Sequence, residues 1–385
     1  MNQECFRWPL ITEETIAKIS DLLRSGRIHR NPELTEGFES DLRRFFRVGH
    51  ALLVCNGTAA AFSAYHALGL GPDDEIIAPA FTHWATAVPA TLLGCGVAFA
   101  DVEPDSCNLS PGSAERLITP RTRAIVVSHM YGNPADVVRL RALCDRHGLF
   151  LVEDLSHAPG AWIGGAPAGS FGDVAFFSMQ ATKTVCGGEG GVLLTRDPRV
   201  YARAVELGHP KRISALPAEF RRYDRVGLGY KFTLSPILAL LAWESFKQIE
   251  AVNEARVAMF RAFRTSIAGH SRISFPAEHE GVRRVFWEYE MFVHPPGRSP
   301  AEIAASLRER GIIADVPRFE FLPDLPHFAR RRAVPGSYPN ARRLREETLV
   351  LRPFSSRDDD ALAEYVRIFR EALSEERTES LSGLP

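Results

Sequence analysis

The 385-residue sequence has no long hydrophobic run and no strong excess of charge of either sign. No stretch approaches the roughly 18 uninterrupted apolar residues of a membrane span, so we expect no such span. The net charge of -1 gives no reason to expect nucleic acid or an anionic membrane as a partner. The first residues include acids and lack an apolar core, so we predict no signal peptide.

The sequence also lacks paired cysteine motifs. Its six cysteines are scattered and show neither a C-x-x-C pair nor the cysteine–histidine spacing of a zinc site. We therefore expect reduced thiols and no metal site. Reduced thiols without a signal peptide favour the cytoplasm as the compartment.

What the sequence does have is a regular alternation of short apolar runs with amphipathic stretches over its first two-thirds. The apolar runs lie at residues 51–55, 74–80, 96–102, 123–130 and 149–155. Such an alternation predicts βα units and an α/β fold with a mainly parallel sheet. Two further runs, 173–178 and 190–195, lie so close together that at least one strand there is predicted to be antiparallel.

A long helical pattern from about residue 235 to residue 267 interrupts this rhythm. Pro236 suits the first turn of that helix. Beyond it, an apolar run at 285–293 and two helical patterns suggest a smaller α/β lobe. We therefore predict a large domain over residues 1–250, including an N-terminal helical segment, and a small C-terminal domain over residues 251–385.

Candidate functional residues follow the predicted strands, and open parallel sheets bind ligands at the carboxyl ends of their strands. Gly57 and Thr58 open a helix, which is either an ordinary capped turn or an anion site made of exposed N–H groups. Asp154 ends an apolar run, with His157 three residues later. This aspartate is either a helix cap or a carboxylate that pairs with a cation in a pocket.

A third group lies in the stretch SMQATKTVCGGEGG at residues 178–191. Ser178 closes a predicted strand, and Lys183 follows five residues later, just ahead of four glycines. Lysine is seldom buried without a reason, and its amine becomes reactive when it loses its water. An amine, an aspartate and a phosphate cradle on one sheet edge are what pyridoxal phosphate (PLP) needs.

These stretches in order resemble the DegT/DnrJ/StrS family of PLP-dependent sugar and cyclitol aminotransferases. The resemblance covers nearly the whole chain through the motifs NGTAAA, GPDDEIIAPAFT, VEDLSHAPGA, FGDVAFFSMQATKTVCGGEGG, VGLGYKF and YPNARRL. It implies the PLP-dependent transferase fold type I. This fold has a mostly parallel seven-stranded sheet in a large domain and a smaller α/β C-terminal domain. The resemblance also implies a homodimer with shared active sites.

The resemblance further implies catalytic roles for three residues. Lys183 would bind the cofactor's aldehyde and transfer protons, and Asp154 would pair with the ring nitrogen. His157 stands where the family usually has glutamine, and its side chain would reach the ring hydroxyl. For His157 two roles stay open, a structural hydrogen bond or acid/base catalysis.

Other residues would hold the cofactor. Ser178 and the backbone of Gly57 and Thr58 would bind its phosphate. The position of His83 favours it as the ring that covers the cofactor, although its neighbour Trp84 stays possible.

The segment VGLGYKF would reach the phosphate in the partner subunit. The family often has asparagine at the position of Gly229, so Lys231 or backbone amides would supply that contact here.

The expected function is transfer of an amino group from glutamate or glutamine to a keto-sugar or keto-cyclitol, in secondary-metabolite or surface-sugar biosynthesis. Related sugar dehydratases have histidine in place of the lysine, so Lys183 favours transamination. No arginine stands out as a clamp for the donor carboxylate. Two alternatives stay open, a PLP enzyme of the same fold that catalyses elimination or aromatisation, and a non-catalytic PLP-fold regulator.

Overall fold

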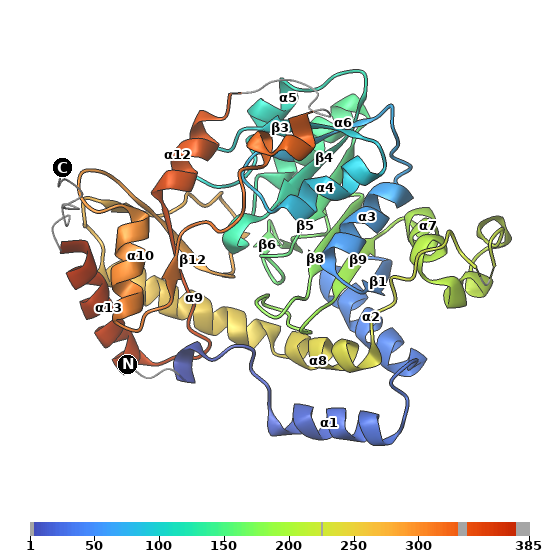
Figure 1. Ribbon diagram of the computed structural model, residues 1–385, viewed down its shortest axis with the longest axis horizontal. Coiled ribbons are helices and arrows are strands. Elements are labelled where there is room, and N and C mark those ends of the chain that lie inside the picture. Colours follow the sequence, from blue (N-terminus) through green and yellow to red (C-terminus); the bar gives the residue numbers. More distant parts are fainter. Residues whose placement is uncertain (1–3, 225, 330–336, 375–385) are drawn as a thin grey trace, which may run out of the picture.

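The computed structural model describes residues 4–224, 226–329 and 337–374, and its centre is a seven-stranded sheet in the order β1-β9-β8-β5-β4-β2-β3 (Figure 1). Six of these strands are parallel, and β9 runs antiparallel to both its neighbours. The predicted mostly parallel sheet and the antiparallel strand are therefore confirmed. The strands are β1 (His50–Val54), β2 (Glu75–Pro79), β3 (Gly96–Ala100), β4 (Thr122–Ser128), β5 (Phe150–Asp154), β8 (Val174–Ser178) and β9 (Gly191–Thr195).

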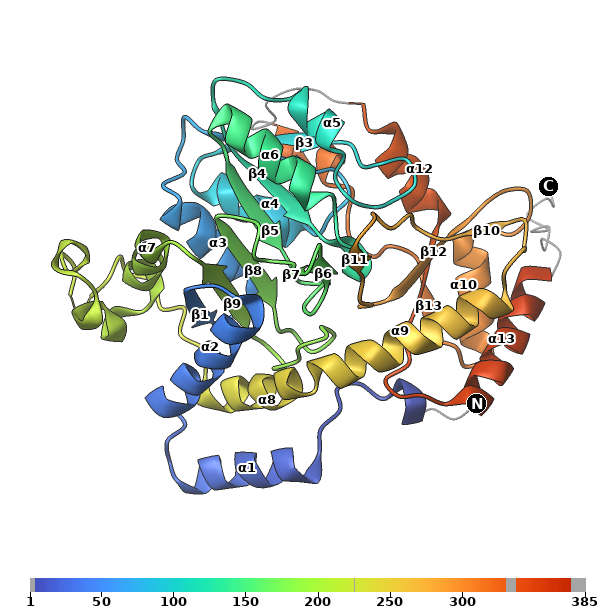
Figure 2. The ribbon, with the colours of Figure 1, turned by 180° about the vertical axis from the view of Figure 1, so that it is seen from behind.

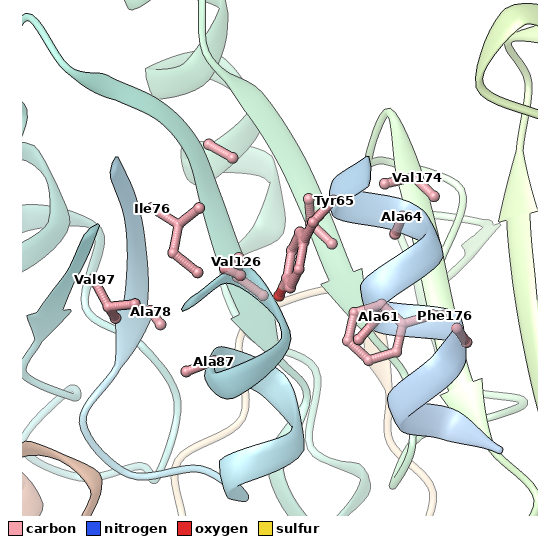
Figure 3. Packing of buried hydrophobic residues seen from close by; sticks show 14 of the residues in the cluster. Ala61, Ala64, Tyr65, Ile76, Ala78, Ala87, Val97, Val126, Val174 and Phe176 are labelled. Atoms are coloured by element: carbon pink, nitrogen blue, oxygen red, sulfur yellow. The ribbon is translucent and has the colours of Figure 1, made fainter. Parts of the chain in front are cut away.

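Helices cover both faces of this sheet because its strands are apolar on both sides. On one face Tyr65 packs with Val126 and Phe176, as Figure 3 shows. This face carries α3 (Gly57–Ala67), α4 (Trp84–Leu92) and α7 (Pro198–Gly208). The other face carries α2 (Pro32–Phe46), α5 (Pro111–Glu115), α6 (Val137–His147) and α8 (Pro236–Lys247).

The smaller lobe is built on a four-stranded antiparallel sheet in the order β10-β12-β14-β13. Its strands are β10 (Ile273–Ser274), β12 (Tyr289–Val293), β13 (Ala314–Asp315) and β14 (Thr348–Leu351). The helices α9 (Ile249–Ser266), α10 (Pro300–Glu309) and α13 (Asp359–Ser374) close its core. The predicted boundary between residues 250 and 251 stays a prediction.

The long helix predicted from residue 235 is in fact two helices, α8 and α9, that meet at Gln248. The apolar side chains of α8, such as Phe246, pack under the large sheet, whereas Phe260 and Phe263 of α9 enter the core of the small lobe. The two helices therefore bury most of their apolar side chains in different cores. The break at Gln248 lets each helix take the direction that its own core requires.

The N-terminal residues join the small lobe rather than the large one. Cys5 and Phe6 of the short helix η1 (Glu4–Phe6) are buried there, and Phe6 packs on Phe354. The chain then runs along α1 (Glu13–Arg24), which lies beside α8 (Figure 2). The N-terminal segment consequently spans both lobes.

The remaining elements are short. They are β6 (Trp162–Ile163), β7 (Ala166–Pro167), β11 (Val282–Arg283), η2 (Met130–Gly132), η3 (Pro210–Ala215), η4 (Ala218–Phe220), η5 (Leu322–Asp324), α11 (Pro326–Ala329) and α12 (Pro339–Glu347). Within the described ranges, no helix has both the length and the apolar character that crossing a membrane requires.

Candidate active site

A cavity of about 660 Å³ lies at the carboxyl ends of the central parallel strands. It brings together most of the residues that the sequence singled out, namely Gly57, Thr58, His83, Trp84, Asp154, His157, Ser178 and Lys183. Gly229 and Lys231 do not line it. They lie after η4, where the chain returns to the large lobe: the neighbouring Leu228 and Phe232 N–H groups donate to the carbonyls of Glu206 and Gly208 in α7.

Lys183 lies in the loop that joins β8 to β9. Its backbone N–H donates to the Gln180 carbonyl at 2.8 Å, and its own carbonyl accepts from Trp8 Nε1 at 3.1 Å. The Nζ atom lies 4.0 Å from the centroid of the Trp287 ring. Burial lowers the pKa of Lys183 from 10.5 to about 8, although Asp154 and Glu288 act in the opposite direction. The loop is thus held at both backbone groups of Lys183, and its amine loses a proton far more easily than an ordinary lysine does.

This shift predicts a distinct reactivity of Lys183 in the cofactor-free protein. Trinitrobenzenesulfonate attacks only the neutral amine, so labelling of Lys183 should rise with pH through a midpoint near 8. A synthetic peptide of residues 178–185, in which the lysine is solvated, is the control and should show its midpoint near the ordinary value. Mass spectrometry of the labelled peptides measures both. Equal midpoints for protein and peptide would contradict the prediction.

Asp154 ends β5 with its carboxylate fixed on both oxygens. Thr86 Oγ1 donates to Oδ2 at 2.7 Å, and the Ser156 N–H donates to Oδ1 at 2.9 Å. The preceding residue strengthens this end of the strand, because the fully buried Glu153 accepts from His129 Nε2 at 3.1 Å. The side chain of Asp154 is therefore held in one orientation before any ligand binds.

His157 lies on the cavity wall, stacked against Trp287 with ring centroids 3.7 Å apart. Burial, reinforced by the charge of Lys183, holds its pKa well below the usual range, so the ring is neutral. Its Nδ1 accepts from the Tyr131 N–H at 3.3 Å. The proton consequently lies on Nε2, which makes that atom a hydrogen-bond donor.

An anion cradle forms where α3 begins. The N–H groups of Gly57 and Thr58 donate to no other residue in the described ranges, and they stand at the positive end of the helix dipole. A Cβ atom at Gly57 would lie only 2.7 Å from Cβ of Ser178. A Cβ at Gly191 would overlap the backbone oxygen of Asn56. These two glycines therefore let the start of α3 approach the strand ends closely.

His83 and Trp84 stand at the mouth of the cavity. His83 caps α4, with its Nδ1 accepting from the Ala85 N–H at 3.2 Å. Burial and the charge of Lys183 lower the pKa of His83, whereas Asp154 raises it. Both charged groups thus act on the His83 ring, although His83 and Trp84 are both exposed residues. This arrangement supports His83 as the ring that faces a bound group.

The residues present fit PLP. Free N–H groups beside Ser178 suit a phosphate, a fixed carboxylate suits a pyridine nitrogen, and a buried amine suits an aldehyde. Several further residues that the sequence did not assign a role line the site or hold it, among them Thr86, Trp287, Glu288 and Arg318. The polar first turn of α4 was a weak signal for Thr86, the family resemblance places the stretch 286–293 with Trp287 and Glu288 toward the substrate pocket, and nothing in the pattern pointed to Arg318.

The architecture is that of the PLP-dependent transferases of fold type I, and comparison with known proteins identifies the family. The sequence matches the DegT/DnrJ/EryC1/StrS aminotransferase family over residues 9–370, so the chain belongs to this family. The predicted family, the fold class and the assignment as an aminotransferase are confirmed. The family and the fold imply PLP as the cofactor.

Three relatives illustrate the likeness. The chain is 32% identical over 362 residues to the dTDP-3-amino-3,4,6-trideoxy-alpha-D-glucose transaminase of Streptomyces venezuelae, with 91% of this chain and 92% of that protein covered. It is 36% identical over 261 residues to the L-glutamine:2-deoxy-scyllo-inosose aminotransferase of Streptomyces kanamyceticus, with 65% and 61% covered. The structure of S. venezuelae DesV in complex with a ketimine intermediate gives a TM-score of 0.84 at 29% identity, covering 94% and 95%.

Proposed function

We propose that this aminotransferase binds PLP and moves an amino group from glutamate or glutamine to a keto-sugar or keto-cyclitol, in the cytoplasm. The observation that carries the proposal is the meeting of Lys183, Asp154 and the free N–H groups of α3 in one cavity. The names of the relatives support both substrate classes, because one acts in the making of an amino sugar nucleotide and the other uses L-glutamine with a cyclitol ketone.

Each catalytic residue has a task that its surroundings suit. Bound PLP supplies an aldehyde for the donor's amine and an electron-accepting ring. Asp154 would pair with the ring nitrogen and keep it protonated, and Nε2 of His157 would donate a hydrogen bond to the ring hydroxyl. The amine of Lys183 would hold the aldehyde at rest and would serve as the base that takes up and returns the proton of the donor Cα. A lysine pKa of about 8 suits this exchange near neutral pH.

The neutral His157 also bears on the choice between its two possible roles. Its low pKa and its stacked, buried ring favour a fixed hydrogen-bond donor over a group that gains and loses a proton in each cycle. We propose the structural role.

The test is a two-stage reaction of the purified, PLP-loaded protein. L-glutamine and L-glutamate are offered first, and bleaching of the cofactor colour together with release of a 2-oxo acid marks donor turnover. A keto-cyclitol and nucleotide-linked keto-sugars are then offered, and mass spectrometry detects the amine. A coloured protein that turns over neither donor would overturn the proposal. Elimination or aromatic products would favour the alternative chemistry, and no PLP binding would favour a regulator.

We also propose that the active protein is a homodimer in which Gly229 and Lys231 reach the partner's cofactor phosphate. Large apolar side chains exposed near them support this, since Leu228 and Tyr230 lie uncovered on the same segment. Light scattering should show a dimer. Lys231→Ala should weaken PLP binding about 10-fold, and the variant should stay dimeric. A monomer with full PLP affinity and activity would contradict the shared site.

A further inference from the structure

The cavity contains a second cation besides Lys183. Among the described residues that line it, Arg318 is the only arginine. Its Nη2 lies 2.8 Å from Oε1 of Glu288, and its Nε lies 3.6 Å from Oδ2 of Asp315. Since the amine of Lys183 is needed for the cofactor aldehyde, Arg318 is the cation left for a substrate carboxylate.

Arg318 is placed on the cavity by a short connection from the small lobe. The connection follows β13, and the next residue, Phe319, packs edge-on against Phe81 of the large lobe with ring centroids 5.2 Å apart. The backbone is thus anchored on both lobes. The Arg318 side chain itself is 58% exposed, so it has room to exchange partners.

Glu288 is the more confined partner. Its side chain is 16% exposed, and its negative charge raises the pKa of Lys183. Burial raises the pKa of Glu288, against the opposing effects of Arg318 and Lys183. The carboxylate therefore depends on nearby cations, and it would need another partner if Arg318 were taken.

Two further arginines line a neighbouring cavity. A second cavity of about 170 Å³ shares Trp287, Glu288 and Arg318 with the first, and Arg256 and Arg352 also line it. Arg256 is 3% exposed and pairs with no carboxylate in the described ranges. Its Nη1 donates to Thr184 and to the Phe286 carbonyl, and its guanidinium lies over Trp8, but its Nε makes no hydrogen bond among the described residues. Glu288 thus stands between two cavities with arginines on both sides.

We propose that Arg318 is the binding site for the α-carboxylate of the amino donor, and that Glu288 covers Arg318 when the ketone acceptor occupies the same cavity. When the donor binds, its carboxylate replaces Glu288, which turns toward Arg256 and Arg352. When a ketone without a carboxylate binds, Glu288 returns, so the arginine does not stay unpaired in the site. The inference rests on the proposed function and names the donor's anchoring residue.

This arrangement addresses a problem that every ping-pong transaminase of two unlike substrates must solve. An amino acid with an α-carboxylate and a ketone without one have to use one cavity in turn. A fixed unpaired arginine would favour the first and penalise the second, whereas a carboxylate that covers the arginine makes the site compatible with both.

Three variants in the PLP-loaded protein test the proposal. Arg318→Gln removes the cation, Glu288→Gln removes the covering charge, and Arg342→Gln is the control. Arg342 also pairs with a carboxylate, that of Asp324, through two hydrogen bonds of 2.7 and 2.9 Å, and it lies outside both cavities. Calorimetry measures binding of glutarate, a non-reactive dicarboxylate, and rapid mixing measures the donor half-reaction.

We expect Arg318→Gln to weaken glutarate binding and raise the donor KM by about 10- to 100-fold, with the acceptor KM changed less than about 3-fold. Arg318→Lys should recover part of the loss because it keeps the charge but not the fork of donors. Glu288→Gln should tighten glutarate binding about 3- to 10-fold, since Arg318 is then uncovered. The control should match the unaltered protein.

The proposal is wrong if Arg318→Gln leaves glutarate binding and the donor KM unchanged. It is equally wrong if Glu288→Gln weakens both as much as Arg318→Gln does, because the pair would then be structural. Failure of the proposed function looks different. In that case the unaltered protein releases no 2-oxo acid, and glutarate binding alone still decides whether Arg318 holds a carboxylate.

Discussion

Lys183→Ala is expected to slow the donor half-reaction by at least about 1,000-fold, because it removes both the amine that binds the aldehyde and the base that moves the proton. The variant should still bind PLP without a covalent bond, since Ser178 and the start of α3 are unchanged. Release of 2-oxo acid in a single turnover measures the rate, and dialysis measures the retained cofactor.

The covalent role can be checked separately from the rate. The chain has five lysines, so borohydride reduction of the PLP-loaded protein followed by peptide mapping should find the cofactor on Lys183 alone. Lys247→Ala is the matched control, because Lys247 pairs with Glu244 on α8 outside the cavity. Donor turnover by Lys183→Ala at the rate of this control would exclude Lys183 as the catalytic amine.

The arrangement of the large lobe could be predicted from the sequence because it depends on local patterns. Each strand of the central sheet is a short apolar run, and the turn into β9 was too short for a parallel crossover. Residues that end such strands, such as Asp154 and Ser178, must meet at one sheet edge. Their grouping in the cavity follows from topology alone.

The rest of the site could not be predicted because it depends on contacts between distant parts of the chain. Glu288 and Arg318 lie 30 positions apart, and they meet because the strands next to them, β12 and β13, both pair with β14 in the small-lobe sheet. Trp8 reaches Lys183 from the N-terminal segment across 175 positions. The break at Gln248 was missed for a similar reason, since helical periodicity does not show that α8 and α9 belong to different cores.

Asp154→Asn is the second change with a large expected effect, a loss of about 100- to 10,000-fold in the donor half-reaction. The amide has the shape of the carboxylate: its oxygen can still accept from the Ser156 N–H, and its NH2 group can donate to the Thr86 hydroxyl in place of the bond that Thr86 now donates. What it loses is the negative charge that would keep a proton on the ring nitrogen, so the loss should appear in the rate rather than in folding or PLP retention. Stopped-flow absorbance measures the rate of the donor half-reaction, and a thermal melt measures the stability of the fold.

Two companion measurements separate this charge from a merely structural contact. Thr86→Val removes one hydrogen bond to Asp154 but keeps the charge, so it should cost only about 10-fold. Because Asp154 raises the pKa of Lys183, Asp154→Asn should also shift the labelling midpoint of Lys183 below about 8 in the cofactor-free protein. If Thr86→Val costs as much as Asp154→Asn, and the midpoint stays in place, then Asp154 orders the end of β5 and its charge is not used in catalysis.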